Sequence, residues 1–238
     1  MRLIALETAT EACSAALWID GEVHWLFERA ASRRHGEMLL EQVHRLLAAA
    51  ELSPTQLDAI AVGRGPGAFT GVRLGLGVAQ GLAFATGIPV APVSTLAALG
   101  QQAAERGAGE ILAVLDARMC ELYWALLYPD ADGRVAAGHE FLSAPEGLSV
   151  DWRAGPRRAL GSGFAAHPDL AARLGLDESE VDAAALPCAR EVAILGASAC
   201  ARGEAVPPEQ AQPVYLRDRV AEPARSTGRV PARGQRGG

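Results

Sequence analysis

Four polar side chains near the start of the chain have the types and spacing of a phosphate-binding hairpin. Glu7 ends an apolar run, and Thr8, Thr10 and Ser14 follow it closely. An acid at a strand end can hold a magnesium ion, while hydroxyls and backbone N–H groups in the turn can hold phosphate. Acids and threonines are also ordinary turn residues, and we favour that structural interpretation over a working phosphate site.

The glycine-rich segment GRGPGAFTG, residues 63–71, is a second candidate for anion binding. Glycines let backbone N–H groups converge, and a helix is predicted to begin directly after the turn. The segment has neither the lysine of a P-loop nor GxGxxG spacing, and Pro66 removes one N–H donor. The alternative is a tight connection between a strand and a helix.

The histidines and cysteines do not have the spacing of metal ligands. His35 and His44 would point to different faces of one helix, and the four cysteines include no CxxC pair. The chain has no lysine, which excludes a P-loop lysine, a Schiff base and an SxxK nucleophile, and it has no GxSxG elbow. We therefore predict no catalytic residue, no metal site and no cofactor.

Composition and charge restrict the class of protein further. Half of the 238 residues are apolar, and no apolar run is long enough to span a membrane, which predicts a cytoplasmic protein with no membrane contact. The net charge is −6, yet residues 217–238 contain six arginines and two acids, which leaves −10 on the preceding residues. Residues 1–216 are therefore too acidic to bind the phosphate backbone of nucleic acid without a partner. The tail is predicted to be disordered, and we favour a solvated tail over one that touches RNA.

Periodicity and turn residues predict the elements that must position these side chains. Asp20-Gly21 has the sequence of a hairpin turn, and Ser94 has the position of a helix cap. Predicted strands are 2–7, 13–20, 22–30, 58–63, 88–93 and a segment near Arg158. Predicted helices are 34–50, 71–87, a segment from Ser94 to about Arg106, and 188–202.

The second half of the chain repeats the order of the first. An apolar strand ends in Asp116 as the first strand ends in Glu7, and Asp132-Gly133 supplies a turn where the first half has Asp20-Gly21. This repeat predicts an α/β, actin-like (ASKHA, ribonuclease H-like) fold of two lobes with a reduced second lobe. The expected ranges are 1–106 for the first lobe, 107–216 for the second and 217–238 for the tail.

The predicted helix 71–87 has rows of small residues at i, i+4 spacing. An internal glycine costs about 1 kcal/mol relative to alanine, so close approach of a neighbouring backbone is expected to compensate. That neighbour could belong to the same chain, or this helix and helix 34–50 could form half of a four-helix interface with a second subunit. One row is Gly67, Gly71, Gly75, Ala79, Ala83 and Gly87, and a second is Gly77, Gly81 and Ala85.

Five segments together resemble the TsaB family: LETATEACSAALW, GRGPGAFTGVRLGLGVAQGLA, PVSTL, DARMCELYWA and AQPVYLR. The resemblance implies a non-catalytic scaffold that shares its fold with the catalytic subunit TsaD and pairs with TsaD through its first two helices. With the ATPase TsaE, the complex would transfer threonylcarbamoyl from threonylcarbamoyl-AMP to adenosine 37 of tRNAs that read ANN codons. The chain would contact tRNA only indirectly and would form a homodimer when alone.

The resemblance places the interface on the first two helices, and we expect Gly75→Leu to abolish pairing while leaving a folded monomer. The predicted interface residues are Met38, Leu39, Val43, Leu46, Gly71, Gly75, Ala79 and Ala83. Two alternatives are a TsaD-like metallo-ATPase or transferase that acts on tRNA itself, and a peptidase of the former glycoprotease grouping. TsaD would be longer and carry an HxxxH motif, and no peptidase nucleophile or metal pair is visible in the sequence.

Overall fold

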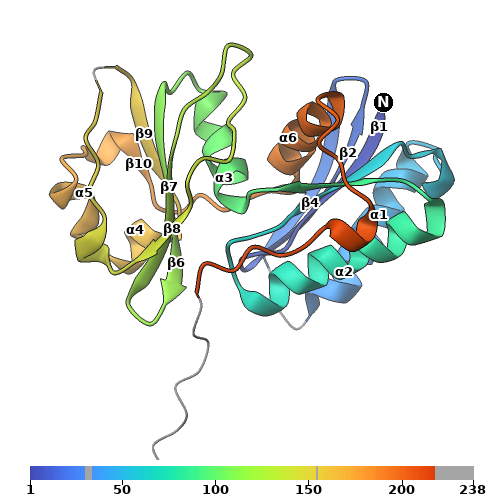
Figure 1. The fold of residues 1–238 in the computed structure, drawn as a ribbon, viewed down its shortest axis with the longest axis horizontal. Helices are drawn as coiled ribbons and strands as arrows, with labels where there is room; N and C mark the ends of the chain where they lie inside the picture. The colour runs from blue at the N-terminus through green and yellow to red at the C-terminus, as the bar shows by residue number, and fades with distance from the viewer. Residues whose placement is uncertain (30–33, 154, 218–238) are drawn as a thin grey trace, which may run out of the picture.

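Two β-sheets lie side by side and form two lobes (Figure 1). The computed structural model describes residues 1–29, 34–153 and 155–217. The tail predicted for 217–238 therefore lies outside the described residues, apart from Arg217. None of the helices in these ranges is long and apolar enough to cross a membrane.

The first sheet has the order β3-β2-β1-β4-β5. It opens with the predicted antiparallel meander, and β1, β4 and β5 then run parallel. The apolar runs of β1 and β4 are almost completely buried, as expected for central strands with helices on both faces. The strands are β1 (Arg2–Glu7), β2 (Ala12–Ile19), β3 (Glu22–Arg29), β4 (Ala59–Gly63) and β5 (Val90–Val93).

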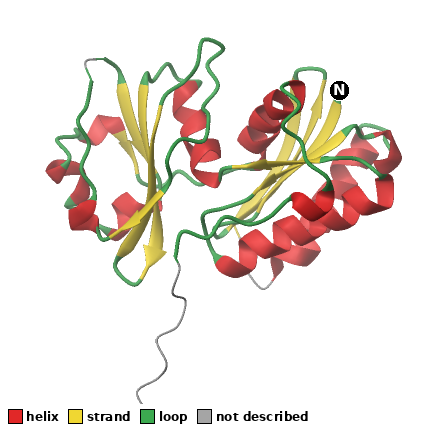
Figure 2. Ribbon diagram, in the orientation of Figure 1, coloured by secondary structure: helices red, strands yellow, loops and turns green. Residues whose placement is uncertain are grey.

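Helices cover both faces of this sheet (Figure 2). Alternation along β1 divides its side chains between two apolar clusters: Ile4 and Leu6 pack with α1 and α2, whereas Leu3 and Ala5 pack with α6. The first sheet is therefore the middle of three layers. The helices are α1 (His35–Ala49), α2 (Phe69–Thr86) and α6 (Ala189–Ala201).

The second sheet repeats this strand order, with β8-β7-β6-β9-β10 corresponding to β3-β2-β1-β4-β5. The two-lobed, actin-like α/β fold predicted from the repeat is confirmed. Its strands are β6 (Glu110–Arg118), β7 (Glu121–Leu127), β8 (Phe141–Ser143), β9 (Arg157–Leu160) and β10 (Val181–Asp182). The remaining α-helices are α3 (Thr95–Ala104), α4 (Ser162–Ala166) and α5 (Leu170–Arg173). Short 3-10 helices are Pro54–Gln56, Pro145–Gly147, Glu178–Glu180 and Pro208–Gln210.

The chain passes between the lobes more than once. The two sheets use strands within 1–106 and 107–216, the ranges expected for the lobes, but α6 follows the second sheet in sequence and packs on the first sheet. Gly196 of α6 lies so close to β4 that an added Cβ would be 2.3 Å from the Cβ of Ala61. The division into two domains therefore remains a proposal.

Polar contacts also join the lobes. Glu140, which precedes β8, pairs with Arg64 of the glycine-rich turn at 3.0 Å and accepts a hydrogen bond from the Ser94 hydroxyl. Ser94 also caps α3, as predicted, by accepting a hydrogen bond from the N–H of Ala97 at 3.0 Å. One buried carboxylate thus connects the first lobe, the start of α3 and the second lobe.

Candidate functional site

Glu7, the acid of the first hairpin, lies inside the protein. Its side chain is buried, and its carboxylate accepts hydrogen bonds from the N–H of Ala9 at 2.7 Å and the hydroxyl of Thr95 at 3.2 Å. A Cβ at Gly63 would lie 2.1 Å from the carboxylate, so β4 closes the remaining side. Glu7 therefore joins strands and α3 and does not face solvent.

The other hydroxyls of the hairpin are divided between structural contacts and the surface. The Thr8 hydroxyl donates to the carbonyl of Gly71 at 2.8 Å, and the Ser14 hydroxyl accepts from the N–H of Ala189 at 2.9 Å. Of the four predicted residues, Thr10 alone faces open space: it lines a cleft between the two lobes, which is described below. The structure therefore does not bring Glu7, Thr8, Thr10 and Ser14 together around one ligand position, and structural turn chemistry accounts for three of them.

Glu7→Gln is expected to flatten the pH dependence of folding stability. Burial raises the pKa of Glu7 from 4.5 to about 7. The unfolded chain therefore ionises first as pH rises, so stability is full below about pH 4.5 and falls by on the order of 3 kcal/mol by about pH 7. Glutamine keeps an acceptor for Ala9 and can donate to Thr95. The free energy of unfolding of the unaltered protein and of Glu7→Gln can be measured with urea at about pH 5 and about pH 8. An equal loss of stability in the two proteins between these pH values would contradict the prediction.

The glycine-rich turn also uses its backbone groups internally. The N–H of Ala68 donates to the carbonyl of Ala9 at 2.7 Å, and a Cβ at Gly67 would lie 2.6 Å from the same oxygen. Glycine is needed there for close approach to the first hairpin. The turn is thus a tight strand-to-helix connection that packs against the first hairpin.

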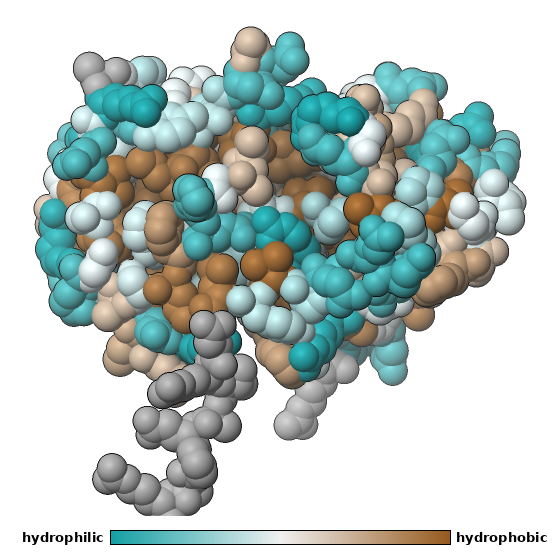
Figure 3. Space-filling model, in the orientation of Figure 1, coloured by the Kyte–Doolittle hydropathy of each residue, from teal (hydrophilic) through white to brown (hydrophobic). Residues whose placement is uncertain are grey.

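A cleft of about 770 Å³ lies between the lobes. Figure 3 shows apolar surface at this junction among polar residues. Asp116, the counterpart of Glu7, lines the cleft, and its carboxylate accepts from the N–H of Arg118 at 2.8 Å and pairs with the Arg118 guanidinium at 2.9 Å. The C-terminal segment lines the cleft too: the N–H of Val214 donates to the carbonyl of Arg64 in the first lobe at 2.9 Å, and the Arg217 guanidinium donates to the carbonyl of Ala117 in the second at 3.1 Å. The C-terminal segment therefore passes along this cleft and ties its two sides.

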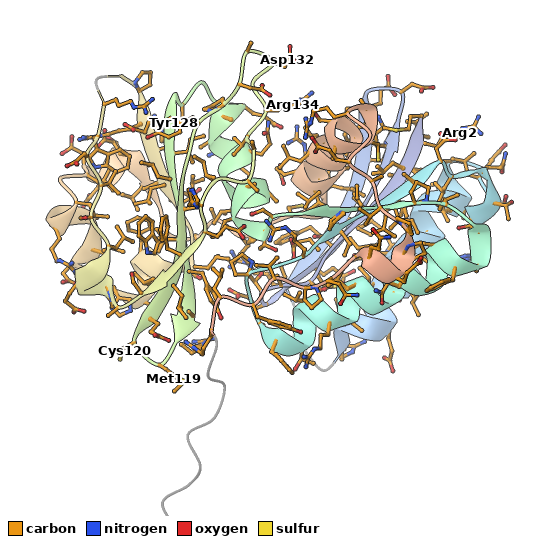
Figure 4. The ribbon with its side chains drawn as sticks, in the orientation of Figure 1. Arg2, Met119, Cys120, Tyr128, Asp132 and Arg134 are labelled. Carbon is orange, nitrogen blue, oxygen red and sulfur yellow. The ribbon has the colours of Figure 1, made fainter. Side chains whose placement is uncertain are left out.

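The turn between β6 and β7 lies at the mouth of the cleft. Arg118, Met119 and Cys120 all have positive φ angles, 64°, 56° and 59°, which cost non-glycine residues about 1 to 3 kcal/mol each. Arg217 stabilises the turn, donating from Nε to the Glu121 carboxylate at 3.0 Å. Met119 is 79% exposed, and Figure 4 shows Met119 and Cys120 at the tip of the second lobe. None of the three is a glycine, so nothing in the sequence signals this conformation.

The eight residues predicted to form an interface are all buried within the chain. They are Met38, Leu39, Val43, Leu46, Gly71, Gly75, Ala79 and Ala83. A Cβ at Gly71 would lie 2.0 Å from the carbonyl oxygen of Thr8, and one at Gly75 would lie 2.7 Å from the Thr8 hydroxyl. The close approach made by this small-residue row is therefore to the first hairpin, within the chain, and the prediction that it faces a second subunit is corrected.

The second small-residue row faces outward. Gly77, Gly81 and Ala85 are exposed, and Cβ atoms built at Gly77 and Gly81 meet no atom of the described residues within 4 Å. On the same helix Phe84 is 64% exposed, and on the neighbouring helix α1 Leu40 is 52% exposed. We call these five residues the α1/α2 face. Leu40 and Phe84 were missed as site residues, although both are large apolar residues outside the buried stripes of their helices.

No three His, Cys, Asp or Glu side chains lie close enough to hold a metal ion within residues 1–29, 34–153 and 155–217. The site that remains is a surface. It combines an exposed, flat Gly/Ala strip with two exposed large apolar side chains on adjacent helices, which is suited to packing against helices of another protein.

Comparisons with known proteins agree over nearly the whole chain. The family model described as "TsaD: tRNA N6-adenosine threonylcarbamoyltransferase" matches residues 28–225. The tRNA threonylcarbamoyladenosine biosynthesis protein TsaB of Escherichia coli K12 is 42% identical over 228 residues, which cover 93% of this chain and 96% of that protein. The TsaB protein of Haemophilus influenzae is 36% identical over 229 residues, covering 92% of this chain and 95% of that protein.

Solved structures show the same fold. A Pseudomonas aeruginosa crystal structure, described as an uncharacterized protein with similarity to peptidase YEAZ, has a TM-score of 0.83 and 44% identity over 91% of this chain and 99% of that chain. YeaZ from Pseudomonas aeruginosa has a TM-score of 0.81 and 43% identity over 90% of this chain and 99% of that chain. From its sequence matches and its fold, the chain belongs to the TsaB family of tRNA threonylcarbamoyladenosine biosynthesis proteins.

Proposed function

We propose that this protein is a non-catalytic, cytoplasmic subunit in the biosynthesis of tRNA threonylcarbamoyladenosine, and that it pairs with TsaD. The relatives named TsaB support the pathway. The internal engagement of Glu7, Thr8, Ser14 and the glycine-rich turn supports a role without phosphate chemistry. TsaE and tRNA would act with the complex, with tRNA touching this subunit only indirectly.

The main support for pairing with TsaD is the α1/α2 face. Gly77 and Gly81 together cost about 2 kcal/mol in helix propensity, and no close contact with the described residues offsets that cost. A partner helix can approach such a strip closely, with Leu40 and Phe84 supplying apolar area at its sides. The helices α1 and α2 pack against each other, so two such pairs would form a four-helix interface.

The same face accounts for a homodimer when TsaD is absent. A two-fold contact uses the same patch on both copies, and a flat Gly/Ala strip is self-complementary. TsaD, with a related fold, would then displace one copy from the homodimer. The proposal thus makes the two pairings mutually exclusive.

Reconstitution tests the function. Purified TsaD and TsaE, tRNA, ATP and threonylcarbamoyl-AMP should form threonylcarbamoyladenosine only when this protein is added. The protein alone should neither hydrolyse ATP nor modify tRNA. Full transfer without this protein, or turnover by this protein alone, would contradict the non-catalytic role.

A further inference from the structure

Two hollows lie along β3, on the face of the first sheet that α6 covers. Their volumes are about 400 Å³ and 460 Å³, and they share Trp25, Glu105 and Arg190. The first is also lined by Trp18 and Val23, and the second also by Phe27 and Leu186. We call the pair of hollows the β3 groove. It lies away from α1 and α2, which cover the opposite face of the sheet.

The strand beside the groove has a free edge. β3 is the terminal strand of its sheet, and within the described residues its backbone is paired only with β2. Trp25 and Phe27 are 49% and 39% exposed, although they are among the largest apolar side chains of the protein. An unpaired edge with exposed apolar side chains is where an extended peptide can add a strand.

One ion-pair network divides the two hollows. Arg190 binds Glu105 at 2.6 Å and Glu191 at 2.8 Å, and its guanidinium carbon lies 5.5 Å from the centre of the Trp25 ring. Glu191 is 96% buried and lines the second hollow, and its Oε2 atom has no hydrogen-bond partner in the part of the chain that the structure describes. The network therefore holds Arg190 beside the Trp25 ring, which lines both hollows.

The remaining charges of the groove are positive. Arg29 and Arg106 line the second hollow and Arg134 lines the first, and none of the three forms an ion pair with any described residue. Figure 4 shows Arg134 between the lobes, on the loop that precedes β8. With Arg190, Glu105 and Glu191 included, four arginines and two glutamates line the groove, so its formal charge is +2 on a body that carries −10. A ligand with negative charge matches it.

We propose that the β3 groove binds an extended, acidic peptide segment of a partner protein. Its backbone pairs with the free edge of β3, and apolar side chains at alternate positions enter the hollows on either side of Trp25. Its carboxylates meet Arg29, Arg106 and Arg134. RNA could also stack on Trp25, but a strand edge and two separate side-chain hollows favour a peptide.

Selection from a random peptide library tests this proposal. A phage-displayed heptapeptide library is selected on the full-length protein and counter-selected on Trp25→Ala. The expected sequences contain at least about twice the input frequency of Asp and Glu, with apolar residues at alternate positions. A synthetic peptide of the selected sequence should bind Trp25→Ala and Arg106→Glu at least tenfold more weakly than the unaltered protein.

Controls separate this groove from the α1/α2 face and from loss of folding. Phe84→Ala, which alters an exposed aromatic residue on α2, should bind the peptide unchanged, and Trp25→Ala should still pair with TsaD. If Trp25→Ala lowers the melting temperature, Arg106→Glu still tests the groove, because Arg106 is exposed and its replacement should not affect folding. No enrichment, selection of basic peptides, or binding of a single-stranded RNA heptamer that Trp25→Ala abolishes would overturn the proposal.

Discussion

A Gly77→Leu variant is expected to fold at least as stably as the unaltered protein and to bind TsaD about tenfold to a hundredfold more weakly. In the part of the chain that the structure describes, nothing lies within 4 Å of a Cβ at this position, so leucine fits the monomer. Leucine is also the better helix former by about 1 kcal/mol. In the complex, its four added carbons would occupy the path of the partner helix. Overpacking costs typically 1 to 3 kcal/mol, and about 1.4 kcal/mol weakens binding tenfold.

Calorimetry with TsaD and thermal unfolding of the free protein measure both parts of this prediction. Gly77→Ala is the matched control, because a single methyl group should reduce affinity by less than tenfold. Self-association, measured by light scattering, should fall together with TsaD binding. Unchanged affinity for TsaD in a folded Gly77→Leu protein would show that α2 faces solvent in the complex.

Gly71→Ala is expected to destabilise the fold by about 3 kcal/mol, although it adds only one methyl group to a helix. Its Cβ would lie 2.0 Å from the carbonyl oxygen of Thr8, a backbone atom that can move only with β1. Overpacking costs about 3 kcal/mol, and loss of the hydrogen bond from the Thr8 hydroxyl to Gly71 costs about 1 kcal/mol. The better helix propensity of alanine offsets about 1 kcal/mol of that sum.

Gly81→Ala is the control for Gly71→Ala, because the same substitution in open space should stabilise by up to about 1 kcal/mol. Urea unfolding of the two variants should therefore shift in opposite directions. Gly75→Leu, which the sequence alone predicts to break pairing, should behave like Gly71→Ala, since its Cβ would lie 2.7 Å from the Thr8 hydroxyl. Equal stability for Gly71→Ala and Gly81→Ala would contradict the packing described here.

The sequence predicted the order of the elements well, because each has a local signal. The Asp20-Gly21 turn, the apolar alternation around it and the Ser94 cap all operate over a few residues. Each is confirmed, and so is the repeat that predicted two lobes. The strained turn at Arg118 to Cys120 had no such signal, because it is stabilised by Arg217 from a distant part of the chain.

The orientation of α2 could not be predicted in the same way. Both rows of the helix consist of Gly and Ala, so the contrast between apolar and polar residues that normally marks the buried side is absent. What fixes the orientation is the contact between Thr8 and Gly71, which are 63 residues apart. Gly77 and Gly81 were recognised as a row, but only the structure shows that their surroundings are open.

The late position of α6 in the chain has a consequence for synthesis on the ribosome. The strands of the first sheet are complete at Val93, but the helix that covers Leu3, Ala5 and Ala61 ends only at Ala201. At roughly 5 to 20 residues per second, the intervening hundred or so residues take about 5 to 20 s to emerge. During that time an apolar sheet face is open to water and to neighbouring nascent chains. The first lobe therefore depends on the completion of the second, and a chain cut before α6 is a substrate for chaperones and proteases.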